Sequence, residues 1–359
     1  MIVDDSAVVR GLVARWISEE PGFSVVGVAA NGRIALDTLE EAQPDVVLLD
    51  LDMPVLDGMA TLPLLLRARP GMSVVIVSTL TQRNAEISLR CLSVGAVDYL
   101  AKPSGSKKLT VSATFRTELM AKLEGLAGRC RRPDGLGSPV PSGTAEFVAL
   151  RDRSPSRAQV ILIAASTGGP RAVIEVLRGL SGPRVPILVV QHMPPIFTAV
   201  FAGHIAAETG LAAAEARDGE PVEPGRVYVA PGGRHMGLAR TASGAPAIRL
   251  DDGPAVSHCR PAVDILMRDA AEIYGAGALA AILTGMGSDG LEGARAFAAV
   301  GGTVVVQDEA SSVVWGMPGS IARARLARSV LPLEGIAAAL EARLGPAAAP
   351  ALPLSRAVA

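Results

Sequence analysis

Short hydrophobic runs alternate with longer amphipathic stretches along the first third of the chain. The runs are MIV, FSVVGVAA, DVVLLD, SVVIVST and VDYLAK, each of strand length. Between the first two, SAVVRGLVARWISEE places Val9, Val13 and Trp16 at helical spacing. Strands that alternate with helices form parallel βαβ units, and continuously apolar strands indicate a sheet covered on both faces. We therefore predict a five-stranded, doubly wound α/β domain over residues 1–125.

This pattern breaks over residues 126–157, where the sequence is rich in Pro, Gly, Ser and charge and is typical of a linker. The runs VILIAAS, PILVVQH, RVYVAPGG, ALAAILTG and TVVVQD then predict a second doubly wound, mostly parallel α/β domain over 158–345. RVYVAPGGRHMGLAR followed by PAIRLDD favours a hairpin inserted into it. The low-complexity residues 346–359 are predicted to be a disordered tail.

Composition narrows the class of protein. Of 359 residues 49% are hydrophobic, which is enough for two buried cores. The formal charge of −1 argues against binding of nucleic acid through bulk electrostatics. Cys91, Cys130 and Cys259 lack the spacing of a zinc motif or a disulfide framework. No signal peptide or membrane-spanning run is evident, so we expect a cytoplasmic protein without membrane insertion.

Polar side chains gather at the predicted strand ends of the first half. They are Asp4, Asp5, Asp50, Ser78 and Lys102. Functional groups of open α/β sheets collect beyond the carboxyl ends of strands, and a cluster of carboxylates there suits Mg²⁺. A lysine and a hydroxyl nearby would hold a doubly charged group on one carboxylate. Alternatively, the first two aspartates cap a helix and Asp50 opens a turn, but five such residues together favour a site.

The motifs IVDDS, LLDLDMPVLDG, IVST and DYLAKPS resemble those of response-regulator receiver domains across the whole first half. The resemblance implies that Asp50 accepts a phosphoryl group from a histidine kinase. It also implies Mg²⁺ bound by Asp4, Asp5, Asp50 and the backbone of Asp52.

Three further residues take roles from the same resemblance. Lys102 and Ser78 would contact the phosphate, and Tyr99 stands where receivers often have a switching aromatic residue. Only Met1, Ile2 and Val3 precede the acidic pair, whereas receivers usually have several more residues there. We expect a mis-assigned start and, if the chain does begin here, a short central strand.

The second half offers a serine, a histidine and an aspartate at three predicted strand ends. Ser166 follows VILIAA, His192 follows PILVVQ, and Asp289 lies in the loop after AAILTG. A serine nucleophile needs a base, and the base needs an orienting partner, so these positions fit a catalytic triad.

Other interpretations of these residues remain open from the sequence. Ser166 could only cap the following helix, and the glycines after it could form a nucleotide-binding turn. Asp289 could merely end its strand. His204 falls in a predicted helix, whereas His235 in the hairpin loop and His258 before a later helix are candidates to line the cleft.

ASTGGP, QHMPPIFT, APGGRHM, CRPAVDIL and LTGMGSDG, in this order behind a receiver, resemble the catalytic domain of the chemotaxis protein-glutamate methylesterase family. The resemblance implies a serine hydrolase that cleaves glutamate γ-methyl esters on methyl-accepting chemotaxis receptors and releases methanol. It also implies deamidation of particular receptor glutamines, a chemosensory histidine kinase as phosphodonor, and no cofactor for the esterase.

The resemblance assigns roles to individual residues. Ser166 would attack the ester carbonyl, His192 would act as general base and then acid, and Asp289 would orient His192. Candidates for the oxyanion hole and cleft are the backbone groups of Thr167, Gly168 and Met286.

Competing functions make different demands on the sequence. A receiver-linked adaptor would lack a triad member, and a transcriptional regulator would carry a basic recognition helix; neither feature is evident. A hydrolase of a different ester or amide would share the triad and stays open. Fusion of a receiver to a hydrolase suggests that the unphosphorylated receiver covers the Ser166 cleft, and that phosphoryl transfer to Asp50 releases it through Ser78 and Tyr99.

Overall fold

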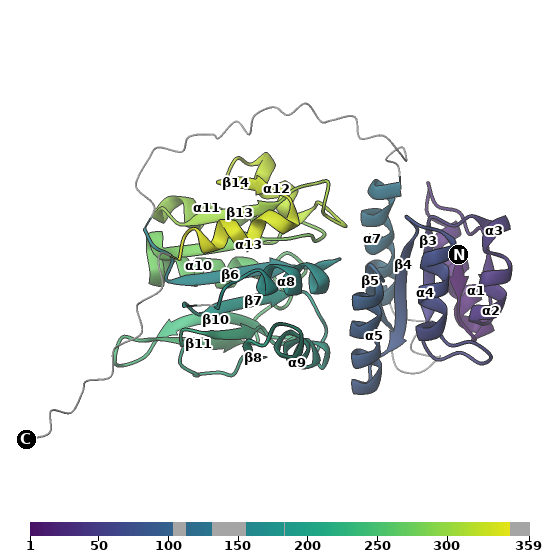
Figure 1. Cartoon of the computed structure of the whole chain (residues 1–359), viewed down its shortest axis with the longest axis horizontal. Helices are drawn as coiled ribbons and strands as arrows, with labels where there is room; N and C mark the ends of the chain where they lie inside the picture. The colour runs from purple at the N-terminus through teal and green to yellow at the C-terminus, as the bar shows by residue number, and fades with distance from the viewer. Residues whose placement is uncertain (103–112, 131–155, 183, 345–359) are drawn as a thin grey trace, which may run out of the picture.

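The structure, a computed structural model, describes residues 1–102, 113–130, 156–182 and 184–344. Two α/β domains lie side by side (Figure 1). Most of the predicted linker and the predicted tail fall outside the described residues. Helix α7 (Ala113–Cys130) runs on past residue 125, at which we placed the end of the first domain.

The first domain has a five-stranded parallel sheet of order β2-β1-β3-β4-β5, as predicted. Its strands are β1 (Ile2–Val3), β2 (Val28–Ala29), β3 (Val46–Asp50), β4 (Ser73–Thr79) and β5 (Asp98–Lys102). Its helices, besides α7, are α1 (Ala7–Ser18), α2 (Gly32–Asp37), α3 (Leu39–Ala42), α4 (Gly58–Ala68) and α5 (Gln82–Val94).

Alternate residues of the central strands point to opposite faces of this sheet. Leu48 and Val75 pack in the core beneath α1 and α7. Their neighbours Leu49 and Ile76 pack on the other face beneath α4 and α5. The continuous apolar runs therefore serve two cores, which explains why the strands do not alternate with polar residues.

Strand β2 is much shorter than the run FSVVGVAA predicts. Only Val28 and Ala29 pair, and they pair with Ile2 and Val3 of β1. Before them, the Gly27 carbonyl accepts from the Ile2 N–H at 3.0 Å, and residues 23–27 are not in a strand.

The second domain has a seven-stranded parallel sheet of order β14-β13-β12-β6-β7-β9-β8, and the predicted hairpin is the antiparallel pair β10-β11. The sheet strands are β6 (Val160–Ala165), β7 (Ile187–Gln191), β8 (Ala212–Glu215), β9 (Arg226–Val229), β12 (Ala278–Ile282), β13 (Thr303–Gln307) and β14 (Ser329–Leu331). The hairpin strands are β10 (His235–Arg240) and β11 (Pro246–Asp251).

Helices cover both faces of this sheet. They are α8 (Gly169–Arg178), α9 (Phe197–Thr209), α10 (Val263–Tyr274), α11 (Leu291–Val300), α12 (Met317–Arg323) and α13 (Leu333–Glu341). Ile161 and Ile163 of β6 pack towards α8, α9 and α13, whereas Val160 and Leu162 pack towards α10 and α11. No helix in the described part of the chain is both long and apolar enough to span a bilayer.

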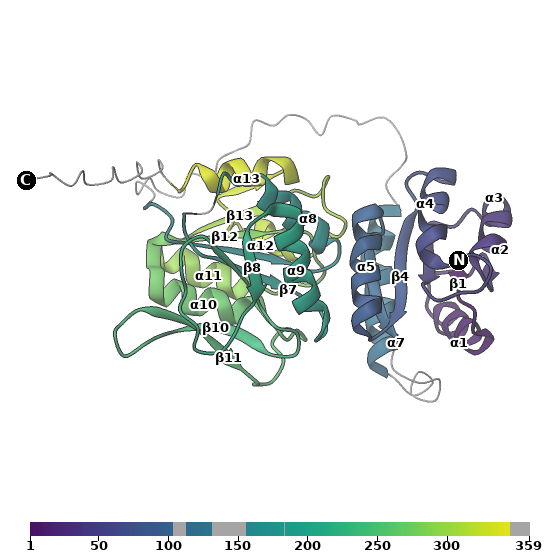
Figure 2. The same ribbon diagram turned by 60° about the horizontal axis from the view of Figure 1, so that its bottom comes forward.

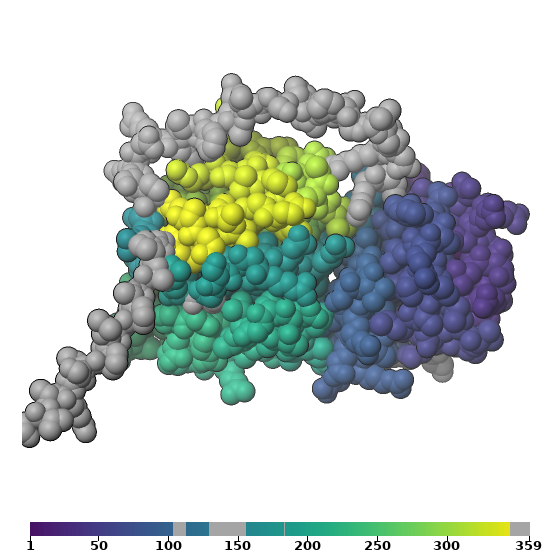
Figure 3. All heavy atoms as spheres, viewed as in Figure 1, coloured from purple at the N-terminus to yellow at the C-terminus, as the bar shows by residue number. Residues whose placement is uncertain are grey.

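The two domains meet along α5, β5 and α7 of the first and along α8, α9 and nearby loops of the second (Figures 1 and 2). The space-filling view shows them in contact along this face (Figure 3). The Tyr99 ring of β5 stacks on the Phe197 ring at the start of α9, with centroids 4.4 Å apart and planes 7° apart. Val313 of the second domain packs against the first-domain core that contains Phe115.

Candidate active site and phosphorylation site

The candidate triad lies where the order of the second sheet reverses. From β6 the chain proceeds to β7 on one side and returns later to β12 on the other. The carboxyl ends of strands at such a reversal form the crevice in which open α/β folds bind ligands. Ser166 follows β6, His192 follows β7, and Asp289 lies in the loop after β12. All three predicted residues therefore lie at one end of the sheet.

Ser166 is held by its backbone, and its hydroxyl has no hydrogen-bond partner within the described residues. Its N–H donates to the Thr284 carbonyl at 3.0 Å, and its carbonyl accepts from the Gln191 side chain at 2.9 Å. The cap of α8 is Gly168, so the interpretation of Ser166 as the helix cap is wrong. Gly168 has a φ of 76°, and a Cβ there would lie 2.5 Å from Val313 Cγ2. The turn therefore needs glycine for both its conformation and its space.

The His192 ring is oriented by Asp289. Nε2 lies 2.9 Å from Asp289 Oδ2. The same carboxylate accepts the backbone N–H groups of Val263 at 2.7 Å and Asp264 at 3.0 Å, at the start of α10. Asp289 has only 1% exposure. Since the carboxylate can only accept, Nε2 carries the proton of the neutral ring, and Nδ1 is left as the basic nitrogen.

His192 is more basic than an ordinary histidine. Burial of the ring lowers its pKa, but the hydrogen bonds of Asp289 and Cys259 outweigh that effect and raise the pKa to about 9. The ring is therefore protonated over most of the neutral range, and raising the pH frees it to act as a base.

Cys259 occupies the side of the ring that faces away from Asp289. Its Sγ lies 3.6 Å from His192 Nδ1. Within the described residues no hydrogen bond joins Ser166 to His192, although the residues before them, Ala165 and Gln191, pair in register. Two adjacent strands thus deliver the serine and the base to one place, with the thiol on the basic nitrogen.

The backbone groups proposed from the sequence for the oxyanion hole remain available. Within the described residues, the N–H groups of Thr167, Gly168 and Met286 donate to no protein acceptor. Thr284 ties the two loops together, because its hydroxyl donates to the Thr167 carbonyl at 2.9 Å and accepts from the Val314 N–H at 3.0 Å.

The other histidines do not join the triad. His204 lies on α9, 3.4 Å from Glu208. His235, which was expected to line the cleft, is fully buried and bridges the Pro254 carbonyl and the Ala262 N–H. His258 is exposed on a turn.

The first domain brings its acidic residues together. Carboxylate oxygens of Asp4, Asp5 and Asp50 lie within 4.8 Å of one another. Lys102 Nζ bridges Asp4 Oδ2 at 2.6 Å and Asp50 Oδ1 at 2.9 Å. Burial raises the pKa of Asp50 to about 6, against the opposing effect of Lys102. Oxygen ligands of this number and charge fit a divalent cation such as Mg²⁺.

The predicted receiver site also includes Ser78, Asp52 and Tyr99. The Ser78 hydroxyl is buried and lies 3.0 Å from the Ser88 hydroxyl. The Asp52 side chain accepts from the Asn84 amide at 3.1 Å. Tyr99 lies outside the cluster, buried against Phe197 of the second domain.

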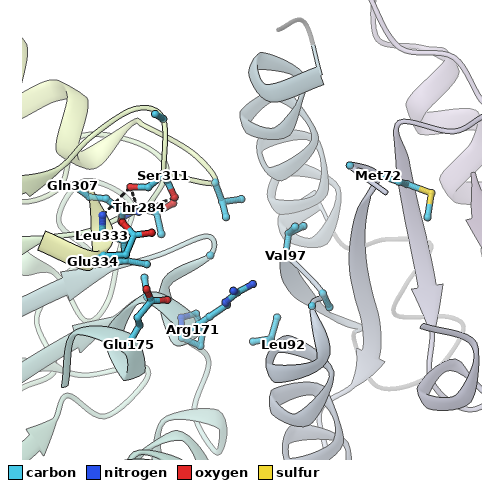
Figure 4. A pocket seen from close by; sticks show the side chains of 18 residues that line it. Met72, Leu92, Val97, Arg171, Glu175, Thr284, Gln307, Ser311, Leu333 and Glu334 are labelled. Carbon is cyan, nitrogen blue, oxygen red and sulfur yellow. Dashed lines mark hydrogen bonds between the residues drawn. The ribbon is translucent and has the colours of Figure 1, made fainter. Parts of the chain in front are cut away.

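A cleft of about 440 Å³ runs between the domains beside the candidate active site. Leu92 and Val97 line it from the first domain, and Gly168 and Thr284, which flank Ser166, line it from the second. Figure 4 shows Arg171 extending from α8 across this space towards Leu92. The first domain therefore faces the loops on either side of Ser166 across this cleft.

Several residues at the site were not predicted from the sequence. Gln191, Thr284 and Cys259 contact triad residues or their loops, yet none follows from strand position or spacing. Gln191 precedes His192 in the chain, and this adjacency is the one sequence signal that could have identified it. Cys259 comes from a distant segment and gave no such signal.

Comparisons with known proteins agree with both domains. Residues 161–340 match the CheB methylesterase family, and residues 1–114 match the response regulator receiver domain. A protein-glutamate methylesterase/protein-glutamine glutaminase of Nitrobacter hamburgensis is 47% identical over 94% of this chain and 91% of its own length. A relative of the same description from Caulobacter vibrioides is 46% identical over 94% of this chain and 96% of its own length.

A solved structure supports the second domain directly. The crystal structure of the Thermotoga maritima CheB methylesterase catalytic domain is 42% identical, with a TM-score of 0.50, and the match covers 52% of this chain and 98% of that one. The two family models and the curated relatives together cover nearly the whole chain. The chain therefore belongs to the CheB methylesterase family, with a response-regulator receiver domain as its first domain.

Proposed function

We propose that this chain is a phosphorylation-controlled serine hydrolase that demethylates glutamate γ-methyl esters on methyl-accepting chemotaxis receptors and deamidates particular receptor glutamines. The observation that carries the proposal is the His192–Asp289 pair beside Ser166 at the reversal of a parallel sheet. The family and the names of the relatives supply the ester and amide substrates. A receiver domain implies a phosphodonor kinase, for which we propose a chemosensory histidine kinase. The cytoplasmic location and the domain limits remain predictions.

The proposed reaction begins with the unpartnered Ser166 hydroxyl. Its proton passes to Nδ1 of neutral His192 as Oγ attacks the ester carbonyl, and the N–H groups near Thr167 and Met286 stabilise the oxyanion. His192 then gives the proton to the departing methoxide, and methanol leaves. Water then attacks the acyl-serine with His192 as the base. His192 returns the proton to Ser166 Oγ, and the glutamate is freed. For glutamine the leaving group is ammonia.

His192 Nδ1 must turn from Cys259 to Ser166 for this reaction. In structures without substrate such bonds are often long or absent and form in the substrate complex. A weak hydrogen bond between sulfur and Nδ1 is easily exchanged for one with a hydroxyl. The Cys259 contact therefore fits a resting state of the base.

In the receiver we propose Asp50 as the phosphoryl acceptor. Asp4, Asp5, Asp50 and the Asp52 carbonyl would hold Mg²⁺, which when bound offsets the negative charge of the phosphoryl group and the carboxylates. Lys102 and Ser78 would contact the transferred group, and the ion pair between the Lys102 ammonium and Asp50 supports this role for the lysine. Arrival of a doubly charged group makes that contact stronger.

The proposal is tested by methanol release from a methylated chemoreceptor fragment. We expect the full chain to release methanol, and to convert glutamine to glutamate in the matching amidated fragment. A panel of unrelated methyl esters and amides provides the control, and we expect turnover of these to be at least about tenfold slower. Equal turnover of the panel would favour a hydrolase of another ester, and no turnover by a folded chain would favour an adaptor.

The base predicts a definite pH dependence. Because His192 must be neutral to accept the Ser166 proton, kcat/KM should rise with pH and level off above about 9, the raised pKa of this ring. Asp289→Asn removes an interaction that raises the pKa, so the midpoint should move to lower pH while the maximum rate falls. The measurement is a pH profile of methanol release at saturating phosphodonor. His204→Ala serves as the control, and a midpoint that is unchanged in Asp289→Asn would contradict this assignment.

A further inference from the structure

Cys259 is a nucleophilic, metal-ligating side chain that the proposed reaction does not use. Its Sγ lies 3.6 Å from His192 Nδ1, and ligand atoms of Cys259, His192 and Asp289 all lie within 4.8 Å of one another. Cys259 is a partly exposed residue. The three residues come from separate segments of the chain and converge only in the fold.

The backbone holds Cys259 in place from both sides. Val256 and Cys259 pair through backbone hydrogen bonds of 2.8 and 3.1 Å around a tight turn. The turn residues Ser257 and His258 have φ values of 52° and 63°, which non-glycine residues adopt at a cost. Buried His235 then anchors the segment before and after the turn. The position of the thiol is therefore fixed by the fold.

The spacing matches that of a zinc site. Zn–S bonds of about 2.3 Å and Zn–N bonds of about 2.0–2.1 Å at a tetrahedral angle place sulfur and nitrogen about 3.6 Å apart. That is the distance between Cys259 Sγ and His192 Nδ1. Asp289 accepts from the other ring nitrogen, which is how histidines that bind zinc are oriented in proteins. Thiolate and imidazole ligands also favour Zn²⁺, whereas Mg²⁺ favours oxygen ligands.

We propose that Cys259 Sγ and His192 Nδ1 bind Zn²⁺, with Asp289 fixing the ring from Nε2. Binding replaces the thiol proton, which is released to water, with a zinc–sulfur bond, and no electrons are transferred. Two protein ligands leave the remaining positions to water. The alternative is that the 3.6 Å contact is a hydrogen bond between the sulfur and the ring and nothing more.

Zinc bound here would occupy His192 Nδ1, the nitrogen that accepts the Ser166 proton in the proposed reaction. Zn²⁺ should therefore inhibit methanol release reversibly, and a chelator should restore it. This consequence rests on the proposed function, whereas zinc binding itself does not. The two are therefore measured separately.

The binding test uses the full chain and Co²⁺ as a spectroscopic substitute for zinc. Excess Mg²⁺ is present to occupy the acidic cluster of the first domain, whose ligands are oxygens alone. We expect a thiolate-to-cobalt absorption band in the near ultraviolet that saturates at one equivalent and disappears when Zn²⁺ is added. Cys259→Ala should abolish the band and weaken zinc binding at least tenfold. Asp289→Asn should weaken it about 10–100-fold.

His258→Ala is the matched control, since it removes an exposed histidine next to Cys259 and should leave the band unchanged. Circular dichroism checks the fold, and Cys259→Ser is the second variant should Cys259→Ala not fold. Absence of the band in the folded wild-type chain, or its persistence in the folded cysteine variant, would overturn the zinc site. A band with no esterase activity would sustain the site and reject the proposed function instead.

Discussion

Replacing Ser166 by alanine should reduce kcat/KM for methanol release by about 10³-fold or more. Ser166 and His192 directly follow paired residues of two adjacent strands, beside the free N–H groups of Thr167 and Gly168, and the Ser166 hydroxyl has no hydrogen-bond partner within the described residues. Without it, only the positioning and oxyanion contacts remain, and these alone give a small residual rate.

The matched control for this variant is Ser181→Ala. Ser181 is exposed beyond the far end of α8, and its backbone, not its hydroxyl, bonds to Glu341. Both variants should bind a methylated receptor fragment equally, because the change at Ser166 removes one small group. If the activity of Ser166→Ala lies within tenfold of that of the control, another residue is the nucleophile.

The central strands could be predicted because their apolar runs are long and unbroken. The runs that became β3, β4, β6, β7, β12 and β13 are buried along almost their whole length. The edge strands β8 and β14 escaped prediction because AAAE and SVL are short and half-exposed. The predicted length of β2 was too great for a similar reason. The apolar pattern of residues 23–27 indicates side-chain packing, but the length of a strand depends on the strand with which it pairs.

The triad could be predicted because strand ends converge in a parallel sheet. The positions of Ser166 and His192 can be predicted without knowing the paths of the loops, since each residue directly follows a strand. The partners of Asp289 could not be found in this way, because they are backbone groups at the start of α10. Cys259 depends on the turn after the β10-β11 hairpin, whose path no local pattern specifies.

Asp50→Asn should abolish the response of the hydrolase to a small phosphodonor with Mg²⁺. In the wild-type chain we expect phosphodonor to raise kcat/KM tenfold or more, which corresponds to about 1.4 kcal/mol. The contacts that phosphorylation would have to loosen are the Tyr99–Phe197 stack and the packing of Val313, which lies between the first domain and Gly168. An Asp50→Asn chain that still responds would place control elsewhere.

Tyr99→Ala should raise the activity without phosphodonor, because it removes the stack that holds the domains together. An aromatic pair of this kind contributes about 0.5–1.5 kcal/mol beyond its buried area, so the basal rate should rise about two- to tenfold. Leu62→Ala is the control, because it removes a fully buried side chain of the same domain from α4, which packs against α2 and α5. If both variants raise the basal rate equally, general loosening of the receiver explains the effect. If only Tyr99→Ala does, the stack itself keeps the first domain over Ser166, and the same variant should then gain less from phosphodonor than the wild type.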